Sequence, residues 1–163
     1  MNQTWINQGT FQNEGSQEAA KLLPPVLKLL KLAGAELHLG LDFSRSLTLN
    51  DFQLGDELIH YILPETTQNS VHYEHNCSGL YIVCQGQVRL LGFDSKGQRE
   101  VSALVLEAGE TFGADDLFGD RILPYRAIAA SEGQLAHIQA AQFTQWLEKL
   151  PALQDYLQEV TQQ

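Results

Sequence analysis

The most informative segment of this chain is Glu110-Thr-Phe-Gly-Ala-Asp-Asp-Leu-Phe-Gly-Asp-Arg-Ile-Leu-Pro-Tyr-Arg-Ala-Ile-Ala-Ala130. Phe112-Gly113 ends a β-rich run, a short helix-like turn follows over residues 114–117, and Arg126 opens a new apolar strand. Glycine lets the backbone approach a ligand closely, and N–H groups at the start of a short helix point toward negative charge. A lone arginine offers a fork of donors that fits a phosphate. The segment therefore predicts an anion cradle between two strands.

This segment resembles the phosphate-binding cassette of cyclic nucleotide-binding domains. The matching features are Phe-Gly followed by a leucine, a short turn, and then Pro-x-Arg-Ala-x-Ala. The resemblance extends upstream over about 90 residues, from Phe52 to Ile138. The upstream motifs are Phe52-x-x-Gly55-Asp-Glu-x-Ile59, Gly79-Leu-Tyr-Ile-Val-x-x-Gly86-x-Val88 and Leu104-x-Leu106-x-x-Gly109-Glu-x-Phe112-Gly113. Their order and spacing make the match more specific than any one motif.

The resemblance implies a site for cAMP or cGMP, with Arg126 on the cyclic phosphate. The residues that match the cassette are Phe112, Gly113, Ala114, Asp115, Arg126 and Ala127. One position departs from the family pattern, because Ala114 stands where binding members carry a glutamate that holds the ribose hydroxyl. A hydrogen bond to a charged group contributes roughly 1.5–3 kcal/mol, so its loss weakens binding about ten- to a hundredfold. The sequence therefore predicts a degenerate cassette.

A structural role for Arg126 is the alternative to phosphate binding. Under this alternative it pairs with Asp115, Asp116 or Asp120 in the same loop. The acidic surroundings of the cassette favour that alternative, since they repel an anion unless solvent screens them.

The composition restricts the classes of partner. Ten basic and twenty acidic residues give a net charge of −10, which disfavours nucleic acid and anionic membranes as partners. No apolar run approaches the ~20 residues of a membrane span, and the first 16 residues do not resemble a signal peptide. The two cysteines, Cys77 and Cys84, are too few for a disulfide framework. We therefore expect a cytoplasmic protein with reduced thiols.

Hydrophobic periodicity predicts a mainly β fold, an antiparallel jelly roll or barrel with flanking N- and C-terminal α-helices. We expect a flexible arm over residues 1–16, a helical segment over 17–34, the jelly roll over 36–139 and helices over 140–163. In the helical segment, Pro24-Pro25 predicts the end of one helix and the start of another. The alternating leucines at 37, 39 and 41 predict a half-buried strand. Further strands are predicted at 47–49, 58–63, 71–73, 80–83, 88–93, 101–106, 125–130 and 134–138.

The last stretch returns to a helical period. Its apolar residues fall at helical spacing, and Pro151 restarts the helix; they are Phe143, Trp146, Leu147, Leu150, Leu153, Leu157 and Val160. This stripe is either core or the face of a dimer or interdomain contact.

Enzymatic alternatives are weaker. His72-x-x-His75 faintly resembles the first motif of cupins, which are also jelly rolls, and His60 lies nearby. However, a spacing of three places the two histidines on opposite faces of a strand. The chain also lacks a Gly-x-Ser-x-Gly elbow and a Gly-x-x-x-x-Gly-Lys loop. We therefore expect no enzyme.

The resemblance implies a non-catalytic regulatory or sensory module with ligand binding weakened or lost. We expect it to act on an output domain of a larger polypeptide, such as a transporter or exporter, or on a second copy through the terminal helices. Three alternatives stay open: a working cAMP or cGMP sensor, a cupin-like metal enzyme, and a structural dimerisation module.

Overall fold

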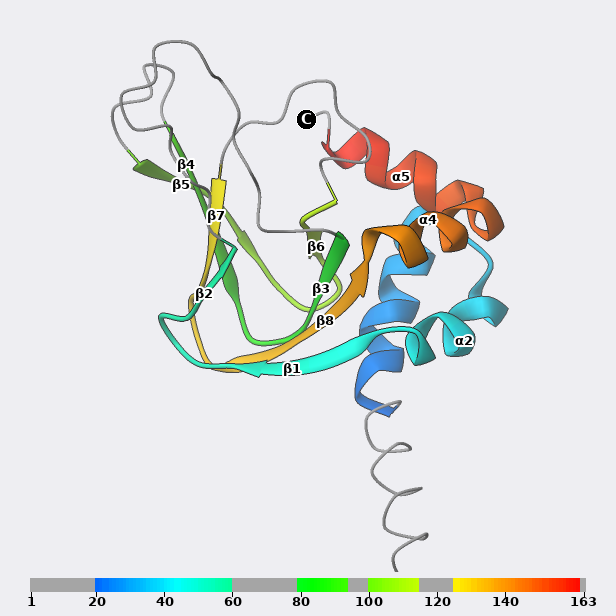
Figure 1. Ribbon diagram of the computed structural model, residues 1–163, viewed down its shortest axis with the longest axis horizontal. Coiled ribbons are helices and arrows are strands. Elements are labelled where there is room, and N and C mark those ends of the chain that lie inside the picture. Colours follow the sequence, from blue (N-terminus) through cyan, green and yellow to red (C-terminus); the bar gives the residue numbers. More distant parts are fainter. Residues whose placement is uncertain (1–19, 60–78, 94–99, 115–124, 162–163) are drawn as a thin grey trace, which may run out of the picture.

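The computed structural model describes residues 20–59, 79–93, 100–114 and 125–161. Two four-stranded antiparallel sheets and a group of helices build this part of the chain (Figure 1). The first sheet has the order β1-β8-β3-β6 and the second the order β2-β7-β4-β5. The strands are β1 (Thr48–Phe52), β2 (Glu57–Ile59), β3 (Gly79–Gln85), β4 (Val88–Phe93), β5 (Glu100–Leu106), β6 (Thr111–Phe112), β7 (Tyr125–Ala129) and β8 (Gly133–Gln139). The predicted antiparallel β fold with flanking helices is confirmed.

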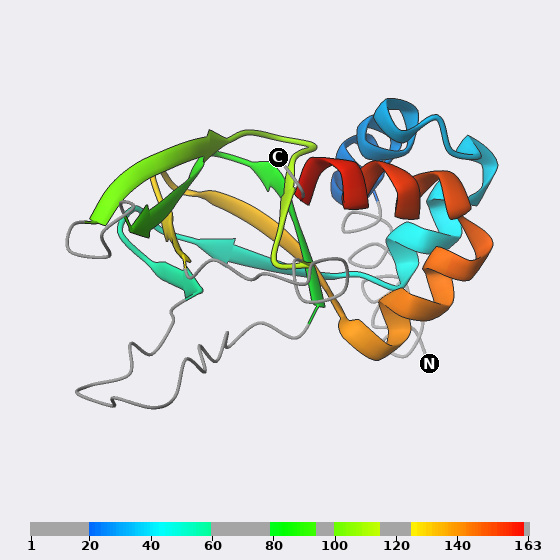
Figure 2. The same cartoon turned by 90° about the horizontal axis from the view of Figure 1, so that it is seen from above.

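The helices lie together at one end of the sheets (Figure 2). They are a helix over residues 20–33, a 3-10 turn η1 (Leu37–Leu39), α2 (Gly40–Arg45), α4 (Ala140–Lys149) and α5 (Pro151–Thr161). The predicted restart of the C-terminal helix at Pro151 is confirmed. No helix in the described part of the chain combines the length and the apolar character that a membrane span requires.

Strand β3 separates two hydrophobic cores. The helical core lies between the first sheet and the helices, and the inter-sheet core lies between the two sheets. Leu80, Ile82 and Cys84 point to one face and pack with the helices, whereas Tyr81 and Val83 point to the other face, toward the second sheet. Successive side chains of a strand alternate between faces, so a strand that is covered on both faces has an almost continuous apolar sequence. This explains the unbroken run over residues 80–84. Burial of the Cys84 thiol among these side chains raises its pKa to about 11.

The predicted strand at residues 37–41 is wrong, because this segment forms η1 and the start of α2. Leu37 and Leu41 are 49% and 41% exposed, so the alternation of leucines does not reflect a buried face. The helical path is fixed by packing that the alternation does not reveal. A Cβ on Gly40 would lie 2.8 Å from the Leu27 side chain, and Phe43 is fully buried.

Pro24-Pro25 does not break the first helix, which is continuous over residues 20–33. Proline removes one backbone donor and disturbs the preceding turn. The helix survives because its buried face, which includes Val26, Leu29 and Leu30, is held in the helical core. Leu32 on the same helix is 55% exposed.

The C-terminal stripe is mostly core. Leu147, Leu150, Leu153 and Leu157 are buried in the helical core, whereas Val160 is exposed. The core interpretation of this stripe is therefore confirmed for its central residues.

Candidate functional site

The cassette begins at the end of β6, which pairs with β3. Phe112 is buried between the two sheets and stacks on Tyr81, its direct cross-strand partner, with ring centroids 5.1 Å apart. The turn before β6 is fixed by two backbone hydrogen bonds, from Gly109 N–H to Val83 C=O and from Val83 N–H to Glu110 C=O. Gly113 follows with a φ of +95°. This conformation is strained for residues with a Cβ, so glycine is required here by the backbone alone.

Ala114 turns away from the inter-sheet core. It is 6% exposed and belongs to the helical core, with residues of β3, β8 and the helices. Phe112 and Ala114 thus contribute to different cores, although only Gly113 separates them. A carboxylate at position 114 would therefore meet apolar side chains.

Arg126 and Ala127 lie on β7, in the second sheet. Ala127 is fully buried between the sheets, while Arg126, one residue earlier, belongs to the opposite face. The Arg126 Nη1 atom lies 3.7 Å from Glu57 Oε2 on β2, and the two side chains are 33% and 42% exposed. The three acids predicted to pair with Arg126 lie outside the described residues; they are Asp115, Asp116 and Asp120. The carboxylate that the structure shows beside Arg126 is Glu57, which the sequence did not indicate.

The face of the second sheet that carries Ala127 is partly open. Leu104 on β5 pairs with Leu90 on β4, and Leu90 pairs with Ala127 on β7. These three side chains therefore share the inter-sheet face. Leu104 is nevertheless 52% exposed, so the first sheet does not cover this end of the second one. The inter-sheet face is thus accessible around Leu104, whereas Ala127 is fully buried.

His137 is a polar residue of the inter-sheet face whose place the sequence did not indicate. It lies opposite Tyr81, and the two rings stack with centroids 4.4 Å apart. Its Nε2 atom is buried and has no hydrogen-bond partner. Burial lowers the pKa of His137 below its usual 6.5. The period-2 spacing from Leu135 was the only signal in the sequence for this orientation.

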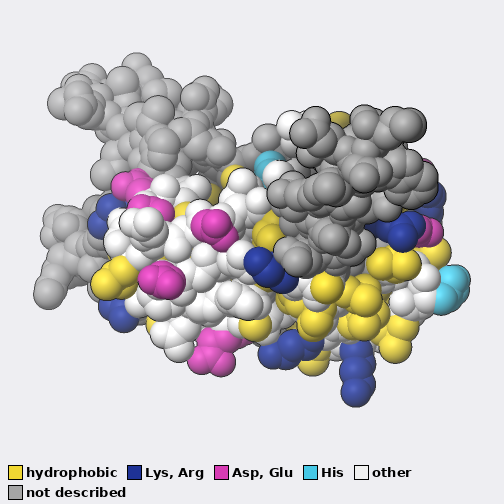
Figure 3. Space-filling view, turned by 90° about the horizontal axis from the view of Figure 1, so that it is seen from below, with side chains coloured by type: hydrophobic (Ala, Val, Ile, Leu, Met, Phe, Trp, Pro, Cys, Tyr) yellow, Lys and Arg dark blue, Asp and Glu magenta, His cyan; other side chains and the backbone are white. Residues whose placement is uncertain are grey.

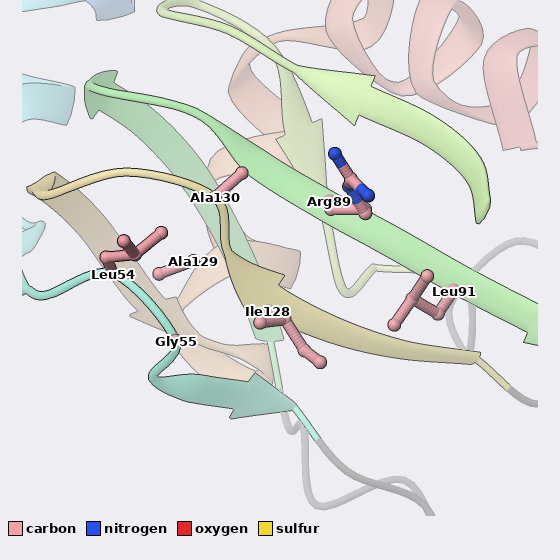
Figure 4. Close-up of a pocket in the computed structure, with 7 residues that line it drawn as sticks. All are labelled: Leu54, Gly55, Arg89, Leu91, Ile128, Ala129 and Ala130. Carbon is pink, nitrogen blue, oxygen red and sulfur yellow. The ribbon is translucent and has the colours of Figure 1, made fainter.

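A shallow hollow of about 380 Å³ lies on the opposite face of the second sheet (Figure 4). Its lining is mostly apolar and comes from the β1–β2 turn, β4 and β7: Leu54, Gly55, Arg89, Leu91, Ile128, Ala129 and Ala130. Arg126 lies directly across from Leu91 in the sheet. Ile128, Ala129 and Ala130 at the end of the cassette-like segment line this hollow, but none of the predicted site residues Phe112, Gly113, Ala114, Arg126 or Ala127 does.

A metal centre finds no support in the part of the chain that the structure describes, which contains no group of three potential ligands. The histidines that suggested a cupin, at positions 60, 72 and 75, lie outside the described residues.

Comparison with protein families matches residues 70–149 to the cyclic nucleotide-binding domain. No curated protein matches the sequence significantly. Among solved structures, the chain is similar to the regulatory subunit of a cAMP-independent protein kinase A from Trypanosoma brucei, with a TM-score of 0.70 and 19% identity over 92% of this chain and 49% of that one. The corresponding protein from Trypanosoma cruzi, bound to guanosine, gives a TM-score of 0.68 and 17% identity over 91% and 48% of the two chains.

A third similar structure is the regulatory domain of Toxoplasma gondii protein kinase A in co-crystal with cAMP. Its TM-score is 0.69, with 16% identity over 90% of this chain and 51% of that one. The chain thus spans about half the length of each of these proteins. At this level of identity the similarities show the fold.

Proposed function

We propose that this chain, which belongs to the cyclic nucleotide-binding domain family, is a non-catalytic regulatory domain with a weakened affinity for cyclic nucleotides. The observation that carries the proposal is the burial of Ala114 in the helical core. Position 114 offers no carboxylate to a ribose hydroxyl, and its side chain is directed into apolar packing. The missing charged hydrogen bond lowers affinity about ten- to a hundredfold.

Other features of the cassette are compatible with a ligand. Gly113 keeps a positive φ, a backbone conformation that allows close approach of a ligand. Ala127 places only a small, buried side chain on the inter-sheet face. Arg126 supplies a guanidinium at the start of β7. Structures of the same fold differ in their ligands, since one is in complex with cAMP and another with guanosine. We therefore assign to this site the weak binding of a cyclic nucleotide, with the phosphate on Arg126, whose guanidinium lies on the face of the second sheet away from Ala127.

A regulatory domain needs an output. We propose a further domain of a larger polypeptide, such as a transporter or exporter, or a second copy of the chain, acting from a cytoplasmic location. The exposed leucines Leu32, Leu37 and Leu41 support contact with a partner at the N-terminal helical segment. Figure 3 shows hydrophobic side chains gathered at the helical end of the molecule, with lysine and arginine side chains at their margin. Exposed apolar side chains of this kind mark interaction surfaces when they are contiguous.

The proposal is tested by titrating the protein with cAMP and cGMP and following heat release and melting temperature. We expect binding that saturates only at high ligand concentration and that is lost in Arg126→Ala. The matched control is Arg89→Ala, which removes an arginine from the same face of the sheet and should bind like the wild type.

Saturation with tight affinity would contradict the weakened site and favour a working sensor. In that case, ligand at a hundred times its dissociation constant adds about 2.7 kcal/mol of stability. Equal binding by the wild type and Arg126→Ala would contradict the role of Arg126. No binding at millimolar ligand would mean that the fold serves only as an interaction platform.

A further inference from the structure

The ion pair between Arg126 and Glu57 joins the two neighbouring strands β7 and β2. Glu57 pairs directly with Ile128, two residues beyond Arg126, so the two charged side chains are diagonal neighbours on one face of the sheet. The register of β2 shifts between Glu57 and Ile59, an irregularity that changes the direction of side chains near the strand end. The distance of 3.7 Å between Nη1 and Oε2 places the carboxylate within ion-pair range of the guanidinium.

We infer that Glu57 competes with a ligand phosphate for Arg126 and thereby sets the affinity of the site. This inference rests on the proposed function, because it requires Arg126 to be the phosphate contact. A guanidinium binds a carboxylate and a phosphate through the same fork of donors. A cyclic phosphate must therefore displace Glu57 from Arg126 or bind beside it, and in the second case the two negative charges repel each other.

The expected size of the effect follows from the exposure of the pair. Both side chains are about one-third or more exposed, so solvent screens the ion pair. Breaking a pair of this kind costs roughly a 1.5- to 5-fold change in an equilibrium constant. Removing one negative charge near the phosphate contributes a factor of similar size. Replacing Glu57 by an uncharged isostere is therefore expected to raise affinity for a cyclic nucleotide about 2- to 25-fold.

The effect should depend on the charge of the ligand. Adenosine carries the same base and sugar as cAMP without the cyclic phosphate, so it has no group that competes with Glu57 for Arg126. The competition predicts that Glu57→Gln raises affinity for cAMP and leaves affinity for adenosine unchanged.

The test is a calorimetric titration of the full chain with cAMP and with adenosine. The variants are Glu57→Gln, Arg126→Ala and the double variant, with circular dichroism to confirm that each is folded. Glu132→Gln is the matched control, because it removes one negative charge from the exposed turn between β7 and β8. We expect tighter cAMP binding in Glu57→Gln alone, no such gain when Arg126 is also replaced, and a wild-type affinity in Glu132→Gln.

Two results would overturn the competition. One is a cAMP affinity of Glu57→Gln that does not exceed that of the wild type, although Arg126→Ala still lowers the affinity. The other is a gain that persists in the double variant or that appears equally for adenosine. These outcomes differ from a failure of the proposed function, which appears as equal cAMP binding by the wild type and Arg126→Ala.

Discussion

Replacing Ala114 by glutamate tests whether the cassette of this chain still has room for the carboxylate that the family places there. Ala114 is 6% exposed and lies in the helical core with residues such as Leu80 and Ile138. Burial disfavours the charged form of a carboxyl group and raises its pKa. A rise of about 1–3 units, at 1.36 kcal/mol for each unit, makes Ala114→Glu roughly 1.5–4 kcal/mol less stable than Ala114→Gln at neutral pH. Glutamine has almost the same shape, so it serves as the matched control for the added volume.

The assay is urea unfolding of both variants between pH 4 and pH 8. The glutamate has a raised pKa in the folded state, so its penalty is complete above that pKa and disappears as the pH falls below about 4.3, the ordinary value for glutamate. At pH 7.5 the difference should lower the melting temperature by about 2–4 °C for each kcal/mol. Equal stability of the two variants at pH 7.5 would refute the reasoning. It would show that the side chain at position 114 reaches water, and Ala114→Glu should then raise the affinity for cAMP.

Two further predictions concern residues that shape the fold around the site. Gly86→Ala should be roughly 1–3 kcal/mol more destabilising than Gly55→Ala. Both glycines have a φ near +90°, but an added Cβ at Gly86 would lie 2.5 Å from the Glu132 carbonyl oxygen, whereas nothing lies within 4 Å of a Cβ at Gly55. Equal urea midpoints of the two variants would contradict this steric explanation. His137→Phe should become more stable than the wild type as the pH falls from 7.5 to 5.5, by up to about 1 kcal/mol. Because burial lowers the pKa of His137, the unfolded chain takes up the proton at a higher pH than the folded chain does. The contribution of neutral His137 to the free energy of unfolding is therefore fully present above pH 6.5 and is lost below it. A stability difference between the two proteins that does not change with pH would contradict this prediction.

The positions of β3 and β4 were predictable from their apolar residues, because burial of a strand face leaves a pattern in the sequence. The runs over residues 88–93 and 80–83 correspond closely to β4 (Val88–Phe93) and β3 (Gly79–Gln85). In β3 the apolar run is continuous, because one face meets the helices and the other meets the second sheet. Gly86, part of the quoted motif, lies between β3 and β4 with a φ of +86°, which suits glycine.

The segment over residues 37–45 was not predictable from its period. Three leucines at alternate positions fit a strand, but two of them are exposed, and the segment is held instead by Phe43 and by the close contact of Gly40 with Leu27. Such contacts join residues far apart in the sequence, and tertiary packing overrides local preference. The same limit applies to Glu57. Nothing in its sequence neighbourhood shows that antiparallel pairing of β2 with β7 brings it to Arg126.

The cassette lies next to the helices, because Ala114 packs in the helical core. Phe112 packs in the inter-sheet core and Ala114 in the helical core, so a movement at Gly113 disturbs both cores together. Close-packed interiors do not absorb such a movement locally. A second link reaches the same region, because Lys28 Nζ donates a hydrogen bond of 2.8 Å to the Ala108 carbonyl in the turn before β6. That lysine belongs to the helix over residues 20–33, which also carries the exposed Leu32. The turn before β6 is therefore in direct contact with the helix that carries Leu32.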